Sequence, residues 1–596
     1  MTRAYIAPVR FYIVIACVLL AFGVIAGRLF YLHVWEQDRL LRILERNRQK
    51  FEVVAADRGD IVDSRGNMLA TTRSVVELGV DPQMVKEEDL SKLPELAGIL
   101  NEPLDVLSKK VKTKVRYVDG PDGSEIRLVR WVELADAIDE STYERILDLG
   151  IRGVYGNQKF ERVYPSGALA AHVLGFVNKE DVASMGVERT MDFYLRGQHG
   201  WRESERDGRR RELAQFRSRE VEPNNGFHVE LTLDLMVQHI IEEALKQIEE
   251  KYAPKGATII VSEPSTGFIL GLANYPSFNP NEFWKYPLDT HRNRAVTDVY
   301  EPGSTFKMVP IAAVLNEGLV TLEDTVDCSI QTVEYRGYPV KLPKDHRPFD
   351  TLTVHDIITK SSNRGVARLA MLVGNEGLYD YARAFGFGES TGFDGIGEVN
   401  GMLHPVQAWD GLTISRMPMG HAVGATPMQV HYATSVIANQ GVLMEPQLVR
   451  RVFDDAGETV LYFNPHAKRR VIKGETAKKV AGLLADTADS GTAKRASIPG
   501  YKVAGKSGTS QKIINKQYSH SHHIASFSGF FPADRPRFVI TIVVDDAEVP
   551  GTAWGGLVAA PAFKRVAEAL IHYYGIQPSE GPNKMFAWKG KRYDSI

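Results

Sequence analysis

The chain has 596 residues, of which 44% are hydrophobic and 24% charged, the values of an ordinary globular protein with two or three domains. Its formal net charge is −2, which excludes the basic excess expected of a nucleic-acid-binding protein. Cys17 and Cys328 are the two cysteines, and an intrachain disulfide is excluded because Cys17 lies within an apolar run.

The first predicted element is a membrane-spanning helix. Residues 11–27 carry no charge, and beyond Arg28 the apolar character continues to Trp35, which gives about 25 residues. A cleaved signal peptide is the alternative, but the apolar run is long and favours a retained anchor. Basic residues flank the run on both sides, so their count does not decide its orientation.

Short apolar runs and turn clusters alternate from there to about residue 225. Residues 36–50 are charged and amphipathic and are predicted to form a helix leaving the membrane, and residues 58–71 have the pattern of strand, turn and strand. The basic run at 209–211 is expected to be a solvated loop, not a polyanion site. The region therefore has a mixed, non-repetitive architecture.

The second half of the chain has an α/β pattern. A predicted helix precedes two strand-like runs, 257–262 and 268–273, which are joined by a turn and form a hairpin. Two further strands surround residues 532–534, a helix closes the domain, and the residues from 577 are expected to be a polar tail. Strands at both ends of the region predict one sheet in which the first and last strands meet. The apolar stripe of the predicted first helix consists of Leu235, His239, Ile240, Ala244, Leu245 and Ile248.

Three motifs point to chemistry. The stretch EPGSTFKM, residues 301–308, places Ser304 and Lys307 one turn apart at the predicted start of a helix. Alone this spacing is common, and a serine at a helix start is usually a cap. The segments SSN at 361–363 and KSGT at 506–509 follow in the order found in active-site serine penicillin-recognising enzymes. The combination indicates a serine nucleophile.

Each residue type suits a step of acyl transfer. We expect Ser304 to attack a carbonyl carbon and Lys307 to accept its proton, because burial and the neighbouring cation Lys506 lower the pKa of the Lys307 ammonium. Ser361 can pass a proton between Lys307 and the leaving amine, since a hydroxyl both donates and accepts. Asn363 can orient Lys307 and hold the substrate amide.

The third motif is expected to bind substrate along a strand edge. Ser507 and Thr509, with Lys506 nearby, would hold a terminal carboxylate, and Gly508 would let the peptide approach closely. The backbone N–H groups of Ser304 and Thr509 are expected to form the oxyanion hole, with each donor contributing on the order of 3 kcal/mol.

Nearly the whole chain resembles the class B penicillin-binding proteins. The resemblance implies a short cytoplasmic tail and anchor (1–35), an N-terminal mixed α/β pedestal (36–225), a transpeptidase domain with an antiparallel sheet flanked by helices (226–576) and a polar tail (577–596). It is carried by RGDIVDSRGNMLA, RVYPSGALAAHVLGFV, GVERTMDFYLRGQHG, STGFILGLANYPSFNPN, RNRAVTDVYEPGSTFKM, MGHAVGATPMQVHYATSVIANQG and IASFSGFFPADRPRFVITIVV.

The resemblance also implies a function. It is that of a peptidoglycan D,D-transpeptidase, a target of beta-lactams that needs no cofactor and works outside the bacterial cytoplasmic membrane on stem peptides. NYPSFNPN and TDVYEPGSTFKM look most like the septal, cell-division type, which implies a polytopic lipid II glycosyltransferase and other division proteins as partners. The chain departs from the family pattern at three places: VEYRGYPVKLPKDHRPFDT, RMPMGHAVG, and Trp554, where the family has tyrosine.

Several alternatives stay open. The same motifs serve an elongation-type transpeptidase, a D,D-carboxypeptidase or a beta-lactamase, and the fold could also serve as a beta-lactam sensor or a scaffold. His520, His522 and His523 could suggest zinc, but without cysteine or carboxylate ligands at a recognisable spacing we expect no metal site and a polar loop beside the active-site strand.

Overall fold

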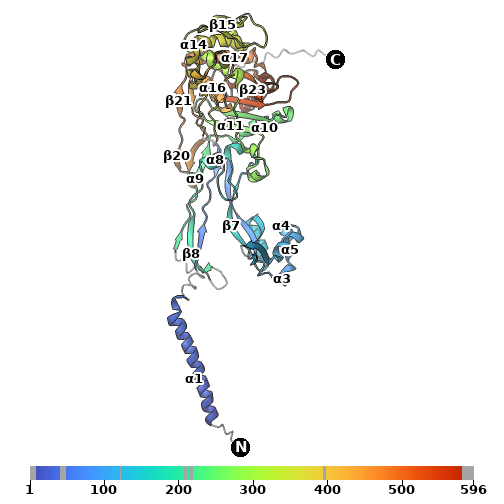
Figure 1. Ribbon diagram of the computed structural model, residues 1–596, viewed down its shortest axis with the longest axis vertical. Coiled ribbons are helices and arrows are strands. Elements are labelled where there is room, and N and C mark those ends of the chain that lie inside the picture. Colours follow the sequence, from blue (N-terminus) through green and yellow to red (C-terminus); the bar gives the residue numbers. More distant parts are fainter. Residues whose placement is uncertain are drawn as a thin grey trace, which may run out of the picture. The chain divides into compact units, whose positions relative to one another are not determined.

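The computed structural model describes residues 8–39, 49–120, 123–206, 212–213, 219–393 and 397–579. The chain divides into two compact units (Figure 1): unit 1 comprises residues 1–57 and 197–226, and unit 2 comprises residues 58–196 and 227–596. The predicted basic loop at 209–211 lies outside the described residues, as do most of the predicted helix at 36–50 and most of the polar tail.

Unit 1 begins with the predicted apolar helix. Helix α1 (Pro8–Phe30) continues as the π-helical turn η1 (Tyr31–Trp35), and the apolar span Val9–Trp35 has 27 residues. Its side chains are not buried by protein, so its length and composition suit a membrane span. The rest of unit 1 is a small antiparallel sheet of β1 (Gln49–Val54), β8 (Gly200–Arg206), β9 (Glu212–Leu213) and β10 (Arg219–Val221).

The N-terminal part of unit 2 is built on a sheet that also recruits strands from later in the chain. The predicted strand-turn-strand is confirmed as β2 (Ile61–Val62) and β3 (Met68–Val80), with the Asp63 carboxylate accepting hydrogen bonds from two N–H groups of the turn. The sheet order is β20-β19-β11-β2-β3-β6, and β7 also pairs with β3. The other strands are β6 (Val132–Ile138), β7 (Val154–Val163), β11 (His228–Leu231), β19 (Val449–Phe453) and β20 (Thr459–Tyr462).

Short helices pack beside this sheet and enclose a separate small core. It includes the buried Leu78, Leu96, Leu107 and Ile146. Figure 1 shows α3, α4 and α5 grouped together near β7. The helices of this region are α3 (Glu87–Leu90), α4 (Leu93–Leu100), α5 (Leu104–Lys112) and α6 (Glu140–Asp148), and the hairpin of β4 (Val115–Gly120) with β5 (Gly123–Leu128) lies between α5 and β6 in the chain. The later helices α7 (Ala171–Leu174), α8 (Gly186–Thr190) and α9 (Asp192–Leu195) contribute instead to the large core of unit 2.

The C-terminal part of unit 2 contains the predicted sheet. Its order is β13-β12-β24-β23-β22 with every neighbour antiparallel, so the hairpin and the meeting of first and last strands are both confirmed. Its strands are β12 (Gly256–Ser262), β13 (Ile269–Tyr275), β22 (Ala504–Ile514), β23 (Gln517–Phe531) and β24 (Phe538–Asp545).

The two faces of this sheet bury different cores because side chains alternate along each strand. Ile259 and Ile540 face a core shared with α10 (Leu235–Tyr252) and α18 (Gly555–Tyr574). Ile260 and Val539 belong to the larger core on the other face. That core is covered by α11 (Arg294–Thr297), α12 (Met308–Asn316), α13 (Val354–Thr359), α14 (Asn363–Ala384), α16 (Pro427–Ala438) and α17 (Gly474–Asp489).

Two predictions about local structure were wrong, the first of them in part. On α10, Ala244, Leu245 and Ile248 are buried as predicted, but His239 is exposed, and Val237 and Ile241 are buried, because adjacent apolar stripes permit two rotations and packing on the sheet selects one. The histidines at 520–523 lie on β23, not on a loop. The two-residue turn forms instead at Asn515 and Lys516, whose φ angles of 52° and 64° match the twist of a tight hairpin.

Candidate active site

The segment around Ser304 opens a buried helix. Residues 303–307 form the 3-10 turn η5, which runs directly into α12. In a 3-10 turn the side chains at positions i and i+3 eclipse, which places Ser304 and Lys307 on one side. Pro310 is tolerated because it lies in the first turn of α12, where an N–H has no helical acceptor. The apolar helix carries Lys307 into the core, where it is 0% exposed.

Hydrogen bonds connect Ser304 to Lys307 through Ser361. The Lys307 ammonium nitrogen lies 2.7 Å from the Ser361 carbonyl oxygen, 3.1 Å from Ser361 Oγ and 2.6 Å from Asn363 Oδ1. The Ser361 hydroxyl in turn donates to Ser304 Oγ at 3.2 Å. When Lys307 is neutral, both hydrogen bonds can reverse, because a hydroxyl donates as well as accepts, and the same contacts then form a route for a proton from Ser304 through Ser361 to Lys307.

The two lysines of the site have lowered pKa values. Burial, and then the charge of Lys506, lower the pKa of Lys307 well below its usual range, against the smaller opposing effect of Asp345. Burial lowers the pKa of Lys506 to about 7. A lysine that is neutral near pH 7 can accept a proton, which an ordinary surface lysine cannot.

Ser361 has a strained backbone. It lies between α13 and α14 with a φ of 61°, in the left-handed region that a residue with a side chain rarely adopts. The next residue, Ser362, caps α14 by accepting a hydrogen bond from the Gly365 N–H at 3.0 Å. The backbone conformation of Ser361 and the cap at Ser362 together direct the Ser361 and Asn363 side chains toward Lys307.

Asp345 is a residue of this site that the sequence analysis missed. Its carboxylate accepts hydrogen bonds from the Asn363 N–H, the Ser362 hydroxyl at 3.0 Å and the Arg364 N–H at 3.3 Å. It thereby holds the start of α14, where a carboxylate also interacts favourably with the helix dipole. It lies 16 residues before Ser361 within an unpatterned loop, so no sequence spacing points to it.

Strand β22 contributes the third motif, and the structure gives Gly508 a different reason from the predicted one. A Cβ atom at Gly508 would lie 2.4 Å from Ser526 Oγ and 2.8 Å from the Pro302 carbonyl oxygen. The glycine therefore lets β22 approach the turn that carries Ser304. These contacts support close packing of the backbone as the reason for the glycine, whereas the predicted reason was room for a ligand. The Thr509 hydroxyl oxygen accepts a hydrogen bond from the Gly555 N–H at 3.0 Å, which leaves its O–H available to donate.

The motifs surround a cavity of about 670 Å³. Of the eight predicted site residues, six line it: Ser304, Ser361, Asn363, Lys506, Ser507 and Thr509. The other two predicted residues do not line the cavity: Lys307 forms a hydrogen bond to Ser361, and Gly508 packs against Pro302. The remaining lining residues are Lys344, Asp345, His346, Met419, His421, Gly491, Thr492, Lys494, Arg495, Trp554, Gly556 and Leu557. These come from loops, from short 3-10 turns and from the start of α18, and such segments meet only in the folded chain, so no sequence spacing points to them.

The histidines of β23 take part in other contacts. His522 Nδ1 lies 2.7 Å from Asp546, and His520 contacts Gln511. His523 is largely buried. Within the described ranges there is no cluster of three or more histidine, cysteine or acidic side chains that could hold a metal ion.

Two family profiles match the chain. Residues 257–568 match the family described as the penicillin binding protein transpeptidase domain, and residues 53–231 match the penicillin-binding protein dimerisation domain. The first match alone covers more than half of the chain.

Individual proteins match over almost the full length. The chain is 30% identical to stage V sporulation protein D of Bacillus subtilis over 96% of this chain and 86% of that protein. It is 29% identical to the peptidoglycan D,D-transpeptidase FtsI of Escherichia coli K12, over 96% and 92% of the two chains. A crystal structure of a peptidoglycan synthetase from Bifidobacterium adolescentis superposes with a TM-score of 0.69 and 26% identity, covering 90% of this chain and 98% of that one.

Proposed function

The chain belongs to the penicillin-binding protein transpeptidases, and from this premise we propose that its reaction passes through an acyl-enzyme on Ser304. It is a peptidoglycan D,D-transpeptidase of the class B type, a serine-type enzyme acting on D-Ala-D-Ala. The observation that carries the proposal is the hydrogen-bonded path from Ser304 through Ser361 to the buried Lys307.

In the first step Ser304 Oγ attacks the carbonyl carbon between the two terminal D-alanines of a donor stem peptide. The serine proton moves through Ser361 to Lys307, the C–N bond breaks, and the proton returns to the departing D-alanine nitrogen. The N–H groups of Ser304 and Thr509 receive the developing oxyanion. In the second step the amine of a neighbouring stem attacks the ester carbon and gives up a proton to Lys307. The ester C–O bond breaks, the proton returns through Ser361 to Ser304 Oγ, and the cross-link is formed.

The substrate is held by β22. Lys506 and the hydroxyls of Ser507 and Thr509 bind the terminal carboxylate. The O–H of Thr509, which is available to donate, supports this assignment. Asn363 binds the substrate amide. Beta-lactams present a strained amide beside a carboxylate, so they acylate the same serine.

Fluorescent penicillin tests the nucleophile. The full chain in detergent should form a stable adduct that maps to the Ser304 peptide, and Ser304→Ala should form none. Ser329→Ala, on an exposed serine outside the cavity, is the matched control and should label like the unchanged chain. An adduct on another residue, or equal labelling of Ser304→Ala, would disprove the proposal.

A thioester donor separates transpeptidase from carboxypeptidase. With rising concentrations of an amine acceptor, the acyl-enzyme should partition toward the amide product. If hydrolysis dominates at every acceptor concentration, the enzyme is a D,D-carboxypeptidase.

We place the enzyme in septal wall synthesis, with a polytopic lipid II glycosyltransferase and other division proteins as partners and with the residues after 35 outside the cytoplasmic membrane. The phrases NYPSFNPN and TDVYEPGSTFKM and the apolar span Val9–Trp35 support this. Depletion of the enzyme should give filamentous cells; rounded or swollen cells would identify an elongation-type enzyme.

The orientation has a separate test. Protease added to spheroplasts should degrade the chain down to its anchor, because the residues after 35 are then accessible from outside the membrane.

The same proposal divides the chain into an anchor (1–35), a pedestal (36–225), a transpeptidase domain (226–576) and a tail (577–596). The two family matches, 53–231 and 257–568, support this division.

A further inference from the structure

Three cations at the active-site cavity are not used by the proposed reaction. Lys344, Lys494 and Arg495 line the cavity, and all three are exposed. None of them has an ion-pair partner among the residues that the structure describes. We call these three residues the cationic rim.

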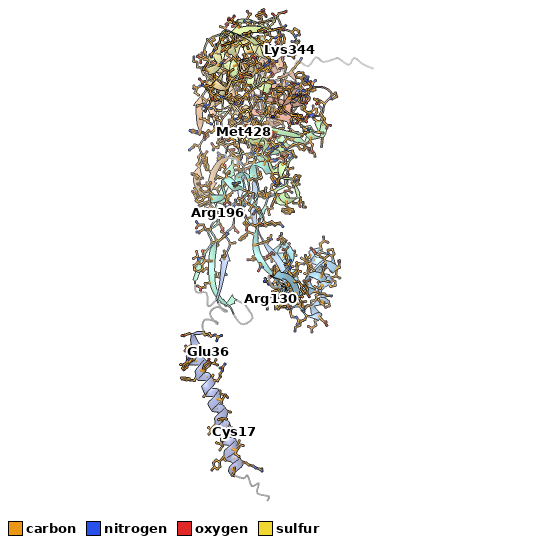
Figure 2. All side chains as sticks on the ribbon, viewed as in Figure 1. Cys17, Glu36, Arg130, Arg196, Lys344 and Met428 are labelled. Carbon is orange, nitrogen blue, oxygen red and sulfur yellow. The ribbon has the colours of Figure 1, made fainter. Side chains whose placement is uncertain are left out.

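The rim sits on two loops that flank the Ser361–Asn363 motif. Lys344 is held next to it because the Asn363 side-chain amide donates to the Lys344 carbonyl oxygen at 2.8 Å. Figure 2 labels Lys344, at the end of unit 2 remote from Arg130. Its backbone position is therefore tied to a residue that contacts Lys307 directly.

The second loop is fixed by close backbone contacts. A Cβ atom at Gly491 would lie 2.6 Å from the Thr359 carbonyl oxygen, and one at Gly556 would lie 2.6 Å from the Thr492 carbonyl oxygen. The loop is thus clamped between the end of α13 and the start of α18. Lys494 and Arg495 follow it in a single 3-10 turn, Lys494–Ala496.

The carboxylate in the cavity lining does not neutralise the rim. Asp345 already accepts hydrogen bonds from Ser362, Asn363 and Arg364. Lys506 adds a further cation, so that four cations and one carboxylate line the cavity and their summed potential inside is positive.

We propose that the cationic rim is a second carboxylate site, which selects stem peptides that carry a free carboxylate in addition to the C-terminal one. The proposal rests on the proposed function, because Lys506, Ser507 and Thr509 are assigned there to the C-terminal carboxylate and leave the rim without a ligand. The second carboxylate has two possible sources: the donor residues before D-Ala-D-Ala, and the acceptor beside its amine. Arg495 suits either, since a guanidinium binds a carboxylate in a bidentate manner.

The donor arm of the test compares two thioester donors of equal length, one with a free side-chain carboxylate and one with the corresponding amide. With the full chain in detergent at low salt, kcat/KM should favour the free acid by about 10-fold, and the preference should shrink as salt rises. Lys494→Gln combined with Arg495→Gln, and Lys344→Gln alone, should reduce the preference while leaving kcat/KM for the amide donor within about 2-fold.

The acceptor arm compares D-alanine with D-alaninamide as the amine that resolves one acyl-enzyme. If the second carboxylate comes from the acceptor, the preference appears in this arm and is lost in the same variants. The matched control is Lys478→Gln with Lys479→Gln, which removes two exposed charges from α17 away from the cavity lining.

The outcomes are distinct. A preference in either arm that falls in the rim variants and not in the control supports the site. Equal rates for acid and amide in both arms, or an equal fall in the control, overturns it and leaves the rim as a solvated surface. Penicillin labelling run in parallel separates the two proposals: without labelling of the unchanged chain the proposed function fails, whereas labelled chains that do not discriminate contradict the rim alone.

Discussion

At the scale of single residues, the site depends on lysines kept out of water. Lys307 and Lys506 are both almost completely buried, and Lys506 lies close enough to lower the pKa of Lys307. A cation that disfavours a second cation nearby is a direct way to keep the second lysine neutral and able to accept a proton. Burial does the rest, because a charged ammonium loses its hydration there.

The first prediction concerns pH. Lys506 has a pKa of about 7, so its charge is present below that pH and lost above it. Because this charge binds the carboxylate of the ligand, the second-order rate constant for acylation by penicillin should fall as pH rises through about 7. The measurement is the rate of penicillin labelling between pH 5 and 9.

Two comparisons check the assignment of this limb. Lys506→Gln should label more slowly and show no fall near pH 7. A penicillin ester, which lacks the carboxylate, should show no such fall with the unchanged chain. An identical limb in Lys506→Gln would assign the titration to another group.

The second prediction separates the chemistry of Ser361 from its backbone. Ser361→Ala and Ser361→Gly both remove the hydroxyl between Ser304 and Lys307, so both should acylate about 100-fold more slowly. Only glycine adopts a φ of 61° without strain, so Ser361→Gly should be about 1 kcal/mol more stable than Ser361→Ala. Urea unfolding measures the difference, and equal stabilities would show that the backbone is not strained there.

At the scale of elements, the site requires close contact between β22 and the turn η5. The contact is possible because glycines stand on both sides of the seam: a Cβ at Gly303 would lie 2.9 Å from the Thr509 carbonyl oxygen, and Gly508 faces Pro302. On the other side of β22, a Cβ at Gly555 would lie 2.2 Å from the Gly508 carbonyl oxygen. Three segments distant in the sequence thus meet through backbone contacts.

The third prediction tests this seam. Gly508→Ala should push β22 away from η5, which lowers stability by about 1–3 kcal/mol and slows acylation by at least about 10-fold. Gly482→Ala is the matched control. Gly482 is exposed on α17 with no atom near its would-be Cβ, so alanine should stabilise the chain by about 0.5–1 kcal/mol and leave acylation unchanged. Normal acylation by a folded Gly508→Ala chain would contradict the account.

At the scale of the whole molecule, a series of buried polar groups joins α16 to the five-stranded sheet. His431 is 0% exposed and lies 2.6 Å from the Ser262 hydroxyl and 3.0 Å from the Thr541 hydroxyl, which continues to Ser528 at 2.7 Å. Burial lowers the pKa of His431 to about 3. The folded chain therefore keeps this imidazole neutral, whereas the unfolded chain protonates it near its ordinary pKa.

The fourth prediction follows from this difference. Between about pH 6.5 and 3 the unfolded state binds one proton more at His431 than the folded state. The free energy of unfolding should therefore decrease as the pH is lowered through that window. From pH 6.5 to 5 the loss from this group is about 1–2 kcal/mol. Chemical unfolding at the two pH values should show a larger loss for the unchanged chain than for His431→Gln, which cannot titrate. Equal losses would show that His431 is not held neutral.

Residue patterns alone predicted the apolar helix long enough to span a membrane, the hairpin, the sheet that joins both ends of the C-terminal region, and the candidate residues of the three motifs. These features depend on local apolar period, on turn residues and on residue types a few positions apart. For the same reason the family could be identified before any geometry was available.

The packing of distant segments settled the remaining features. It buried Val237 and Ile241 on α10 and left His239 exposed, placed the histidines of 520–523 on a strand, and brought Asp345 and the cationic rim to the cavity. It also assigned Gly508 to backbone packing. Such contacts join residues that are distant in the chain, and one sequence carries no record of which distant loops will meet, because packing energies favour many pairings until the fold fixes one.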